Sequence, residues 1–507
     1  MAPMPHRHHL PGGWPAGPGF DWPPGPGFDW PPGPGFDWPP GPGFDWPPAR
    51  ATMALTRAAA SGETAAATSG GDSGEAMSDI FTSDFKDIPW WWECTPRPRL
   101  AVAPLPASVE VAVVGSGYTG LSAALEIARG GRSVLVLDAE DAGWGCSTRN
   151  GGQISTSVKP GYDELARRYG GAAAAGMLRE GQSALAWIGD FVAREGIDCD
   201  FAVPGRFHAA HSPRAYERLA RAVASQPKGL EVPAHVVPRS EQRRELGTEV
   251  YHGGVVYERH ASVDPARFHQ GLLERVRSAG ATVVGNCRVT AIGRDGDGHR
   301  LATAQGAVRA RKVVVATNGY TGALTPWLRR RVIPIGSYII ATEPLAPAVM
   351  DRVMPTNRVV SDSRKVVYYY RPSPDRRRIL FGGRVTGGET DPRHSGRLLR
   401  AELVRLFPEL AAVRVSHSWM GYVAYTFDTL AHVGCRDGIH YAMGYCGSGV
   451  SMASYLGMRV GQQVLGKAEG RTAFDGLGFP TRPLYNGRPW FLPATVAFYR
   501  WRDTLGL

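Results

Sequence analysis

The sequence predicts an α/β fold with additional α+β elements, preceded by a disordered tail. Three observations support this prediction. Residues 109–114 (VEVAVV) are rich in β-branched apolar side chains, as a buried parallel strand requires. A glycine-rich turn and a helical pattern follow that strand directly. The first 76 residues, in contrast, contain repeats that neither a helix nor a sheet can accommodate.

The composition is that of an ordinary globular protein with room for two or three domains. The chain has 507 residues, of which 43% are hydrophobic and 20% charged. It lacks an apolar run of about 18 residues, so we expect no integral membrane segment. Six scattered cysteines without a CxxC pair argue against a zinc ribbon and a disulfide framework. A reducing, cytoplasmic location is the simpler interpretation.

The chain is strongly basic, with a formal net charge of +11. A nucleic-acid or membrane partner is one interpretation, and a GC-rich coding sequence is another, because 51 Arg stand against 6 Lys. The arginines are spread out, in clusters no larger than those at 329–331 and 376–378, and aromatic residues do not alternate with them. Stacking on nucleic-acid bases requires such aromatic platforms, so we expect no nucleic-acid partner.

The octapeptide GPGFDWPP occurs four times between residues 17 and 48. Five of its eight residues are Gly or Pro, which prevents regular secondary structure. Residues 49–76 are rich in Ala, Ser, Gly and Thr. We therefore expect residues 1–76 to be disordered, with translation starting at Met53 or Met77. Three nearby histidines (His6, His8 and His9) lack a structural frame, and we expect no metal site.

The turn at 115–120 (GSGYTG) has the spacing of a dinucleotide-binding site. Gly115 permits the tight turn, Gly117 allows the backbone to approach a pyrophosphate, and Gly120 allows the helix to pack on the strand. Tyr118 and Thr119 begin the helix, whose N-terminus attracts phosphate. A second strand follows at 134–137 and ends at Asp138, which can accept hydrogen bonds from ribose hydroxyls. This motif alone does not distinguish NAD from FAD.

The next segment indicates FAD. Residues 143–153 (GWGCSTRNGGQ) resemble the stretch after the second strand in the D-amino-acid oxidase, glycine oxidase and sarcosine oxidase superfamily of FAD enzymes. In that superfamily, small residues and an Arg-Asn-Gly-Gly turn bring backbone amides to the flavin. The resemblance implies that the following residues line the FAD: Ser147, Thr148, Arg149, Asn150, Gly151, Gly152 and Gln153.

Later landmarks follow in the superfamily's order, so the resemblance covers residues 80–470. Residues 288–290 match the strand that contacts the adenine, with Val289 as the contact. Residues 312–320 match the strand and turn that return to the FAD at Asn318 and Gly319. Backbone amides at a helix start would face the flavin pyrimidine ring and stabilise negative charge there. The residues of that start are Gly447, Ser448, Gly449 and Val450.

The resemblance also implies the domain organisation. A leader (77–104) precedes a discontinuous FAD-binding, Rossmann-like domain made of residues 105–160, 260–335 and 415–470. A substrate domain built on an antiparallel sheet is inserted as residues 161–259 and 336–414. A C-terminal tail (471–507) is expected to pack back through Trp490, Phe491, Tyr499 and Trp501.

Within the superfamily, the chain most resembles the gamma-glutamylputrescine oxidase type, at its leader DFKDIPWW and at SYIIATEPL and LFGGR.

The cysteine that links flavin covalently in sarcosine oxidases is replaced by Val423, so we expect non-covalent FAD. Two basic residues that hold a carboxylate in those enzymes match Gly152 and Ser451. Arg371 is the best alternative anchor, and Tyr338 and Tyr369 are candidate substrate contacts, although residues of a strand alternate between two faces.

The implied activity is the oxidation of a small-molecule amine or amino acid. Hydride transfer to flavin N5 gives an imine that hydrolyses to an aldehyde or keto acid, and oxygen or a quinone then takes the electrons. A gamma-glutamylputrescine-like amine is the favoured substrate. Alternatives are a D-amino-acid or N-methyl amino-acid dehydrogenase and a non-catalytic flavoprotein or interaction protein. The sequence identifies neither a catalytic acid or base nor the oligomeric state.

Overall fold

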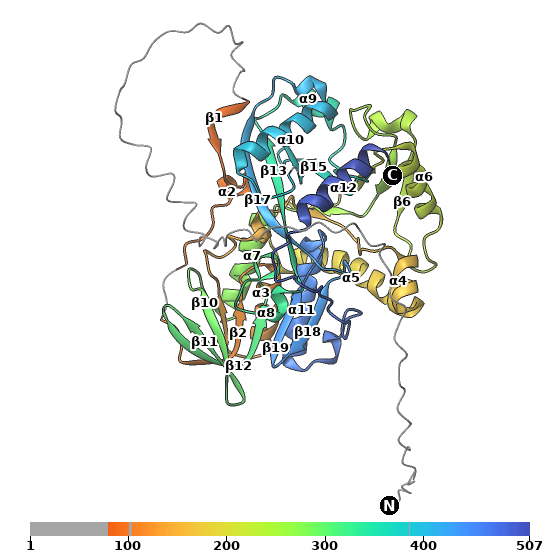
Figure 1. Ribbon diagram of the computed structural model, residues 1–507. Coiled ribbons are helices and arrows are strands. Elements are labelled where there is room, and N and C mark those ends of the chain that lie inside the picture. The colour runs from red at the N-terminus through yellow and green to blue at the C-terminus, as the bar shows by residue number, and fades with distance from the viewer. Residues whose placement is uncertain (1–79, 101–103, 385, 507) are drawn as a thin grey trace, which may run out of the picture. The chain divides into compact units, whose positions relative to one another are not determined.

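The computed structural model of the protein describes residues 80–100, 104–384 and 386–506, which belong to one compact unit, Met77–Leu507 (Figure 1). The predicted disorder of residues 1–76 lies outside the described residues. Within the described part, two large β-sheets and the helices packed on them confirm the α/β fold class.

The first sheet has eight strands and a parallel centre. Its order is β10(Val289–Asp295), β11(Gly298–Thr303), β12(Gly306–Val315), β2(Ser108–Val114), β3(Val134–Leu137) and β9(Thr282–Val284), with β18(His432–Arg436) and β19(Ile439–Met443) joined through β12. Strands β2, β3, β9, β12 and β19 pair in parallel. The central strands are apolar on both sides because both of their faces are covered. This sheet corresponds to the expected Rossmann-like part.

Three helices cover one face of this sheet: α3(Tyr118–Arg129), α7(Pro265–Ser278) and α11(Gly449–Leu465). Alternate residues of β2, such as Val111 and Val113, join the cluster beneath these helices. The residues between them, Ala112 and Val114, face the cluster that β10–β12 and α8(Pro326–Arg329) complete. One set of alternate β2 residues therefore packs under α3. Since α3 begins directly after β2, its N-terminus lies at the carboxyl end of that strand.

The second sheet has nine strands and is mainly antiparallel. Its order is β1(Phe81–Lys86), β17(Val415–Tyr425), β13(Ile333–Thr342), β16(Ile379–Gly383), β15(Tyr368–Pro372), β14(Val359–Asp362), β5(Arg206–Ala209), β7(Gly254–Tyr257) and β6(Ala234–Val237). An apolar cluster on one of its faces includes side chains of α9(Pro347–Val353) and α10(Pro392–Leu406). The remaining elements are α2(Trp91–Cys94), β4(Gln153–Ile154), α4(Tyr162–Tyr169), α5(Gly171–Glu195), α6(Pro213–Ala224), β8(Ala261–Ser262) and α12(Leu492–Thr504).

Strand β17 belongs to the second sheet, although it begins the segment 415–470 that the resemblance places in the FAD domain. It pairs along β13 from Val415 to Tyr425. The leader also joins this sheet, since β1 pairs with the other edge of β17. The register of a long antiparallel pair is set by contacts between distant segments, which the local sequence does not show.

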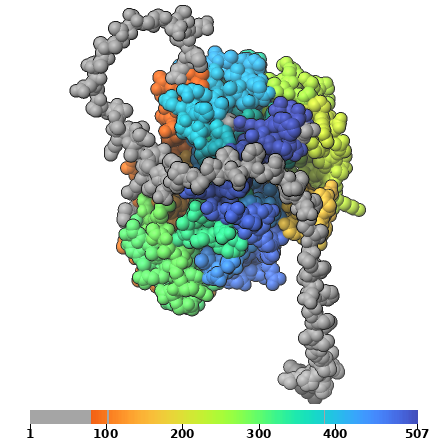
Figure 2. Space-filling view, viewed as in Figure 1, coloured from red at the N-terminus to blue at the C-terminus, as the bar shows by residue number. Residues whose placement is uncertain are grey.

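The C-terminal tail packs back on the second sheet only in part. Tyr499 packs with Val366 and Leu492, and the Asp503 carboxylate accepts hydrogen bonds from the amides of Lys365 and Val366 at 2.9 and 3.0 Å. Trp490 and Trp501, expected to be packed, are 70% and 58% exposed. In Figure 2 the dark blue C-terminal residues form part of the surface beside the cyan segment.

Among the described residues, no helix combines the length and the apolar character that crossing a membrane requires, including the 25-residue helix α5.

Candidate active site

The turn between β2 and α3 has the backbone geometry expected for a phosphate cradle. Gly115 has a φ of +105°, which favours glycine. A Cβ on Gly120 would stand 1.9 Å from the Gly115 carbonyl oxygen, so only glycine fits. A Cβ on Gly117 would stand 2.9 Å from the Ser147 hydroxyl. Gly117 offers no side-chain cap to α3, whose first turn contains Tyr118 and Thr119, and a helix N-terminus attracts an anion.

The acid after β3 is held against this turn. The Asp138 carboxylate accepts hydrogen bonds from the Ser116 amide at 2.7 Å and the Ser116 hydroxyl at 2.6 Å. Its other oxygen accepts from the Glu140 amide at 3.0 Å. Asp138 is only half-buried. The carboxylate is therefore fixed beside the turn, where a ribose bound at the end of β2 would meet it.

The flavin loop, residues 143–153, folds over the start of α3. The Ser147 hydroxyl accepts a hydrogen bond from the Tyr118 amide at 3.0 Å. Within the loop, Asn150 Nδ2 donates to the Cys146 and Ser147 carbonyls at 3.1 and 3.0 Å, and its Oδ1 accepts from the Gly152 amide at 2.8 Å. Asn150 thus closes the loop on itself and presents Gly151 and Gly152 towards the second sheet.

Three tryptophans that the sequence analysis did not assign to the site fasten this loop. The indole N–H groups of Trp91, Trp92 and Trp419 donate to the Asn150 carbonyl (3.0 Å), the Thr148 hydroxyl (2.8 Å) and the Arg149 carbonyl (2.9 Å). The resemblance of the leader motif DFKDIPWW did not indicate these contacts. The WW pair in a leader was the one local signal, since buried Trp N–H groups need partners.

Arg149 is held by aromatic rings and backbone carbonyls. Its guanidinium lies 4.6 Å from the ring centroids of both Trp92 and Trp144. Its Nε donates to the Trp144 carbonyl at 2.7 Å and its Nη1 to the Met420 carbonyl at 3.2 Å. Burial lowers the pKa of Arg149 from its ordinary value. Arg149 therefore joins the loop to β17 rather than lying on the surface.

Two segments later in the chain were also predicted to contact the FAD, one at Asn318 and Gly319 and the other at Val289. Asn318 and Gly319 form a tight turn after β12, and Asn318 Oδ1 accepts a hydrogen bond from the Gly444 amide at 3.0 Å. This bond ties the end of β12 to the segment that leads into α11. Val289 is buried at the start of β10, which lies across β11 from β12.

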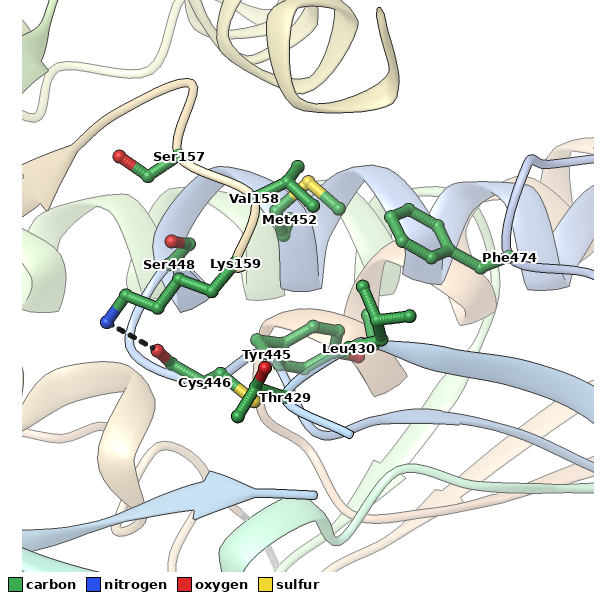
Figure 3. A pocket seen from close by; sticks show the side chains of 11 residues that line it. Ser157, Val158, Lys159, Thr429, Leu430, Tyr445, Cys446, Ser448, Met452 and Phe474 are labelled. Atoms are coloured by element: carbon green, nitrogen blue, oxygen red, sulfur yellow. Dashed lines mark hydrogen bonds between the residues drawn. The ribbon is translucent and has the colours of Figure 1, made fainter. Parts of the chain in front are cut away.

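The start of α11 carries the glycine-rich segment, with Gly447 at a φ of +96°. Ser448 precedes the helix, and its side chain does not cap it. Lys159 reaches this segment from the end of the flavin-loop region, and its Nζ donates to the Cys446 carbonyl at 3.3 Å (Figure 3). Lys159 and Ser448 line a small pocket with Tyr445, Met452 and Phe474. No sequence motif indicated that Lys159 would lie at this site.

Tyr369 and Tyr338 lie on opposite faces of the second sheet. The Tyr369 ring faces the flavin loop, because a Cβ on Gly151 would stand 3.2 Å from it, and its hydroxyl lies 2.8 Å from the Ser337 hydroxyl. Tyr338 is fully buried in the α10-side cluster and donates to Glu389 at 2.7 Å. Since alternate strand residues point to opposite faces, Tyr338 does not share the face that Tyr369 presents to the loop.

Arg371 is close to the flavin loop, but its hydrogen bonds go to backbone carbonyls. Nη1 donates to Val263 at 3.0 Å and Gly152 at 3.3 Å, and Nε donates to Pro372 at 3.1 Å. Burial lowers the pKa of Arg371 to about 10. Gln153 makes a parallel connection, donating to the Val360 and Tyr370 carbonyls at 3.3 and 3.2 Å. Both side chains join the loop to the second sheet.

The residues present fit a bound dinucleotide. The cradle that a Cβ would fill at Gly120, the open N-terminus of α3 and the fixed Asp138 suit a pyrophosphate and a ribose. The flavin loop and the start of α11 lie further along the same edge. Fold and site together are those of a dinucleotide-binding redox protein.

Comparison with known proteins gives the family. The model of the FAD dependent oxidoreductase family matches residues 110–463, and the chain belongs to that family. It is 32% identical to the gamma-glutamylputrescine oxidoreductase of Escherichia coli, over 78% of this chain and 93% of that protein. It is also 32% identical to the probable oxidoreductase OrdL of Rhizobium meliloti, over 78% of this chain and 92% of that protein. The protein is therefore an FAD-dependent oxidoreductase, as the sequence predicted.

Solved structures show the same fold. Glycine oxidase from Geobacillus kaustophilus superposes with a TM-score of 0.63 at 21% identity, covering 75% of this chain and 99% of that chain. L-proline dehydrogenase from P. horikoshii gives a TM-score of 0.61 at 17% identity, covering 77% and 99%.

Proposed function

We propose that the protein oxidises an amine that carries a carboxylate at a distance, of the gamma-glutamylputrescine type. One observation carries the proposal. The flavin loop and one face of the second sheet meet where Gly151 lies against Tyr369. Ligand pockets occur between such domains. The 32% identity to gamma-glutamylputrescine oxidoreductase of Escherichia coli supports this substrate class.

The cofactor would be held by the cradle at Gly115–Gly120, by Asp138, by the flavin loop and by the start of α11. FAD, when bound, accepts the hydrogen and the two electrons that the amine carbon loses. The chain's own task is to orient the substrate and to exclude water. Tyr369 and Ser337 present hydroxyl groups at the sheet face, and Lys159 places a positive charge beside the helix start at Gly447. We assign no catalytic acid or base.

We further propose that the cofactor is not covalently bound. Val423 stands where sarcosine oxidases carry the linking cysteine. The two cysteines near the site are poor nucleophiles, because burial raises the pKa of Cys146 to about 11 and that of Cys446 to about 11.

The test is anaerobic reduction of the flavin band near roughly 450 nm by single amines: gamma-glutamylputrescine, putrescine, sarcosine and D-alanine. Bleaching by gamma-glutamylputrescine at the lowest concentration is the expected result. Bleaching by sarcosine or D-alanine alone would instead favour an N-methyl or D-amino-acid dehydrogenase. Retained flavin that none of the four reduces would contradict the proposed activity. Admission of air then shows whether oxygen reoxidises the enzyme.

A further inference from the structure

The face of the second sheet that meets the flavin loop continues across three more strands. Tyr369 on β15 is paired with Ser361 on β14, and Ser361 is paired with His208 on β5. Arg206 lies two residues before His208 and is paired with Tyr257 on β7. Paired residues share a face, and so do residues two apart on one strand. Tyr369, Ser361, His208, Arg206 and Tyr257 therefore line one continuous surface.

The opposite face of β5 is ordinary core. Phe207 and Ala209 are fully buried in the cluster that includes α9 and α10 side chains. Arg206 and His208, in contrast, are half-buried and keep contact with solvent. The sequence RFHA thus places Arg206 and His208 on the sheet face that carries Tyr369, and Phe207 and Ala209 in the core.

Within the described part of the chain, Arg206 has no carboxylate partner. Its guanidinium lies 5.0 Å from the Tyr257 ring centroid, and its Nε is buried without a hydrogen-bond acceptor among the described residues. Burial lowers the pKa of Arg206, and the one charge interaction that opposes this comes from Tyr257. The guanidinium is only half-buried, but its Nε has no acceptor among the described residues, so the geometry leaves room for an anionic partner from outside the chain.

The surroundings of Arg206 are basic and polar. His208 Nδ1 lies 2.9 Å from the Ser361 hydroxyl. The His260 ring stacks on Tyr257 with centroids 5.0 Å apart, and its Nδ1 is buried without a partner among the described residues. Burial lowers the pKa of His208 to about 3, and Arg206 and Lys159 add to this effect. Arg206 and His208 likewise add to the effect of burial on the pKa of His260.

We propose that Arg206 binds a carboxylate of the substrate at the end remote from the reacting amine. The inference rests on the proposed function and names the group that would recognise such a substrate. A guanidinium donates two parallel hydrogen bonds to a carboxylate, and Arg206 has no carboxylate partner among the described residues.

The separation of Tyr369 and Arg206 is close to the length of gamma-glutamylputrescine. Tyr369 and Arg206 lie two strands apart, about 10 Å across the sheet, and two residues apart along the strand direction, about 7 Å, so their Cα atoms are about 12 Å apart. In extended gamma-glutamylputrescine, the reacting carbon and the carboxylate are about 11 Å apart. A small amino acid such as glycine cannot span this distance, whereas a gamma-glutamylated diamine can.

The test compares two amines, of which only gamma-glutamylputrescine carries a glutamyl group with its carboxylate. We would measure the concentration that half-bleaches the flavin for gamma-glutamylputrescine and for putrescine, in wild type and in Arg206→Gln. We expect a rise of about 10–100-fold for gamma-glutamylputrescine, the range of a charge-assisted hydrogen bond, and little change for putrescine. An equal effect on both amines, or none on either, would overturn the assignment of Arg206.

Arg218→Gln is the matched control. Arg218 is an exposed residue of α6 that, like Arg206 and Lys159, lowers the pKa of His208. The substitution removes the same charge without touching the sheet face, so we expect wild-type values for both amines. A loss equal to that of Arg206→Gln would show a general charge effect and would count against a contact at Arg206.

A binding measurement separates this inference from the proposed function. Isothermal titration calorimetry with glutarate, which cannot be oxidised as an amine, reports carboxylate binding directly. Glutarate binding that Arg206→Gln abolishes and Arg218→Gln retains supports the anchor, even if no amine in the panel reduces the flavin. Glutarate binding that is absent from wild type, together with no discrimination between the amines, would reject it.

Folding is checked by flavin content and melting temperature. We expect Arg206→Gln to keep both, since the replaced charge has no partner to lose. If it does not fold, Arg206→Lys retains the charge but not the two parallel donors. It should weaken glutarate binding at least several-fold, and unchanged binding would contradict the proposal.

Discussion

The guanidinium of Arg371 donates a hydrogen bond from strand β15 to the carbonyl oxygen of Val263, 3.0 Å away, and a second, at 3.3 Å, to that of Gly152. Val263 lies between β8 and α7, whereas Gly152 belongs to the flavin loop. One side chain therefore connects the second sheet with two segments that border the cofactor cradle, and Arg371 is better placed to position the loop than to hold a substrate directly.

Substitution of Arg371 distinguishes these two roles. Arg371→Met leaves the Val263 carbonyl without this donor, and we expect the free energy of unfolding to fall by about 1–3 kcal/mol, with weaker FAD retention. Urea unfolding and the flavin-to-protein absorbance ratio measure both. A variant with unchanged stability but a large rise in KM for a carboxylate-bearing substrate would instead show that Arg371 is a substrate anchor.

The cradle glycine Gly120 gives a sharper prediction for the cofactor. In Gly120→Ala the new methyl group meets the Gly115 carbonyl oxygen, 1.9 Å away in the present geometry. The helix must move from the turn, so we expect at least a tenfold loss of bound FAD. Gly293→Ala is the control, because a Cβ at Gly293 meets no atom within 4 Å. Equal flavin content in both variants would mean that the cofactor does not bind at this turn.

Acid should destabilise the protein through His260. Burial lowers the pKa of His260 to about 2, while a histidine in the unfolded chain titrates near 6.5. The stability that the neutral ring contributes is thus fully present above pH 6.5. It is lost as the pH falls, by about 1.4 kcal/mol per unit. Urea unfolding between pH 5 and 8 should show a shallower slope for His260→Gln than for wild type. Parallel slopes would contradict the neutral state assigned to His260.

The C-terminal helix α12 should depend on Asp503. The carboxylate accepts hydrogen bonds from the Lys365 and Val366 amides at 2.9 and 3.0 Å. Asp503→Ala leaves both amides unpaired, at a cost of about 1–3 kcal/mol each. Trypsin should then cut sooner at Arg500 and Arg502, as mass spectrometry would show. Asp503→Asn retains one acceptor and should be intermediate, and identical cleavage rates would indicate that other contacts hold the helix.

Acid precipitation of the protein tests whether the FAD is covalently bound. Since the thiols of Cys146 and Cys446 are protonated at neutral pH, we expect acid precipitation to leave FAD in the supernatant. Flavin fluorescence in the pellet, lost in Cys146→Ala or Cys446→Ala, would reveal a covalent bond.

The parts of the site that the sequence predicted are local in the chain. The turn at Gly115–Gly120 and Asp138 belong to one strand, helix and strand unit, and each glycine has a steric reason for its position. The tryptophan contacts were not predictable, because Trp91 and Asn150 are 59 residues apart and Trp419 and Arg149 are 270 apart. Because strand residues alternate, Tyr369 must point to the opposite face of the sheet from Tyr368 and Tyr370. Which of the two faces meets the flavin loop depends on the segments that pack on each face, and the sequence does not show these.

The role proposed for Arg206 was not predictable from the sequence either. An arginine in a short strand is ordinarily a solvated or paired residue, and the sequence cannot show that its neighbours across the sheet are Tyr257 and Val359. The pairing of β17 with β13 was not predictable for a similar reason, since the two strands are about 80 residues apart in the chain.

The pairing of β1 with β17 has a consequence for the order of events on the ribosome. Phe81 finds its partner at Val415, so the leader strand must wait for more than 300 further residues to be synthesised. At about 5–20 residues per second, this delay is on the order of half a minute. Trp91 and Trp92, which fasten the flavin loop, follow directly after that strand. The nascent chain therefore cannot complete its cofactor loop until nearly the whole polypeptide has emerged.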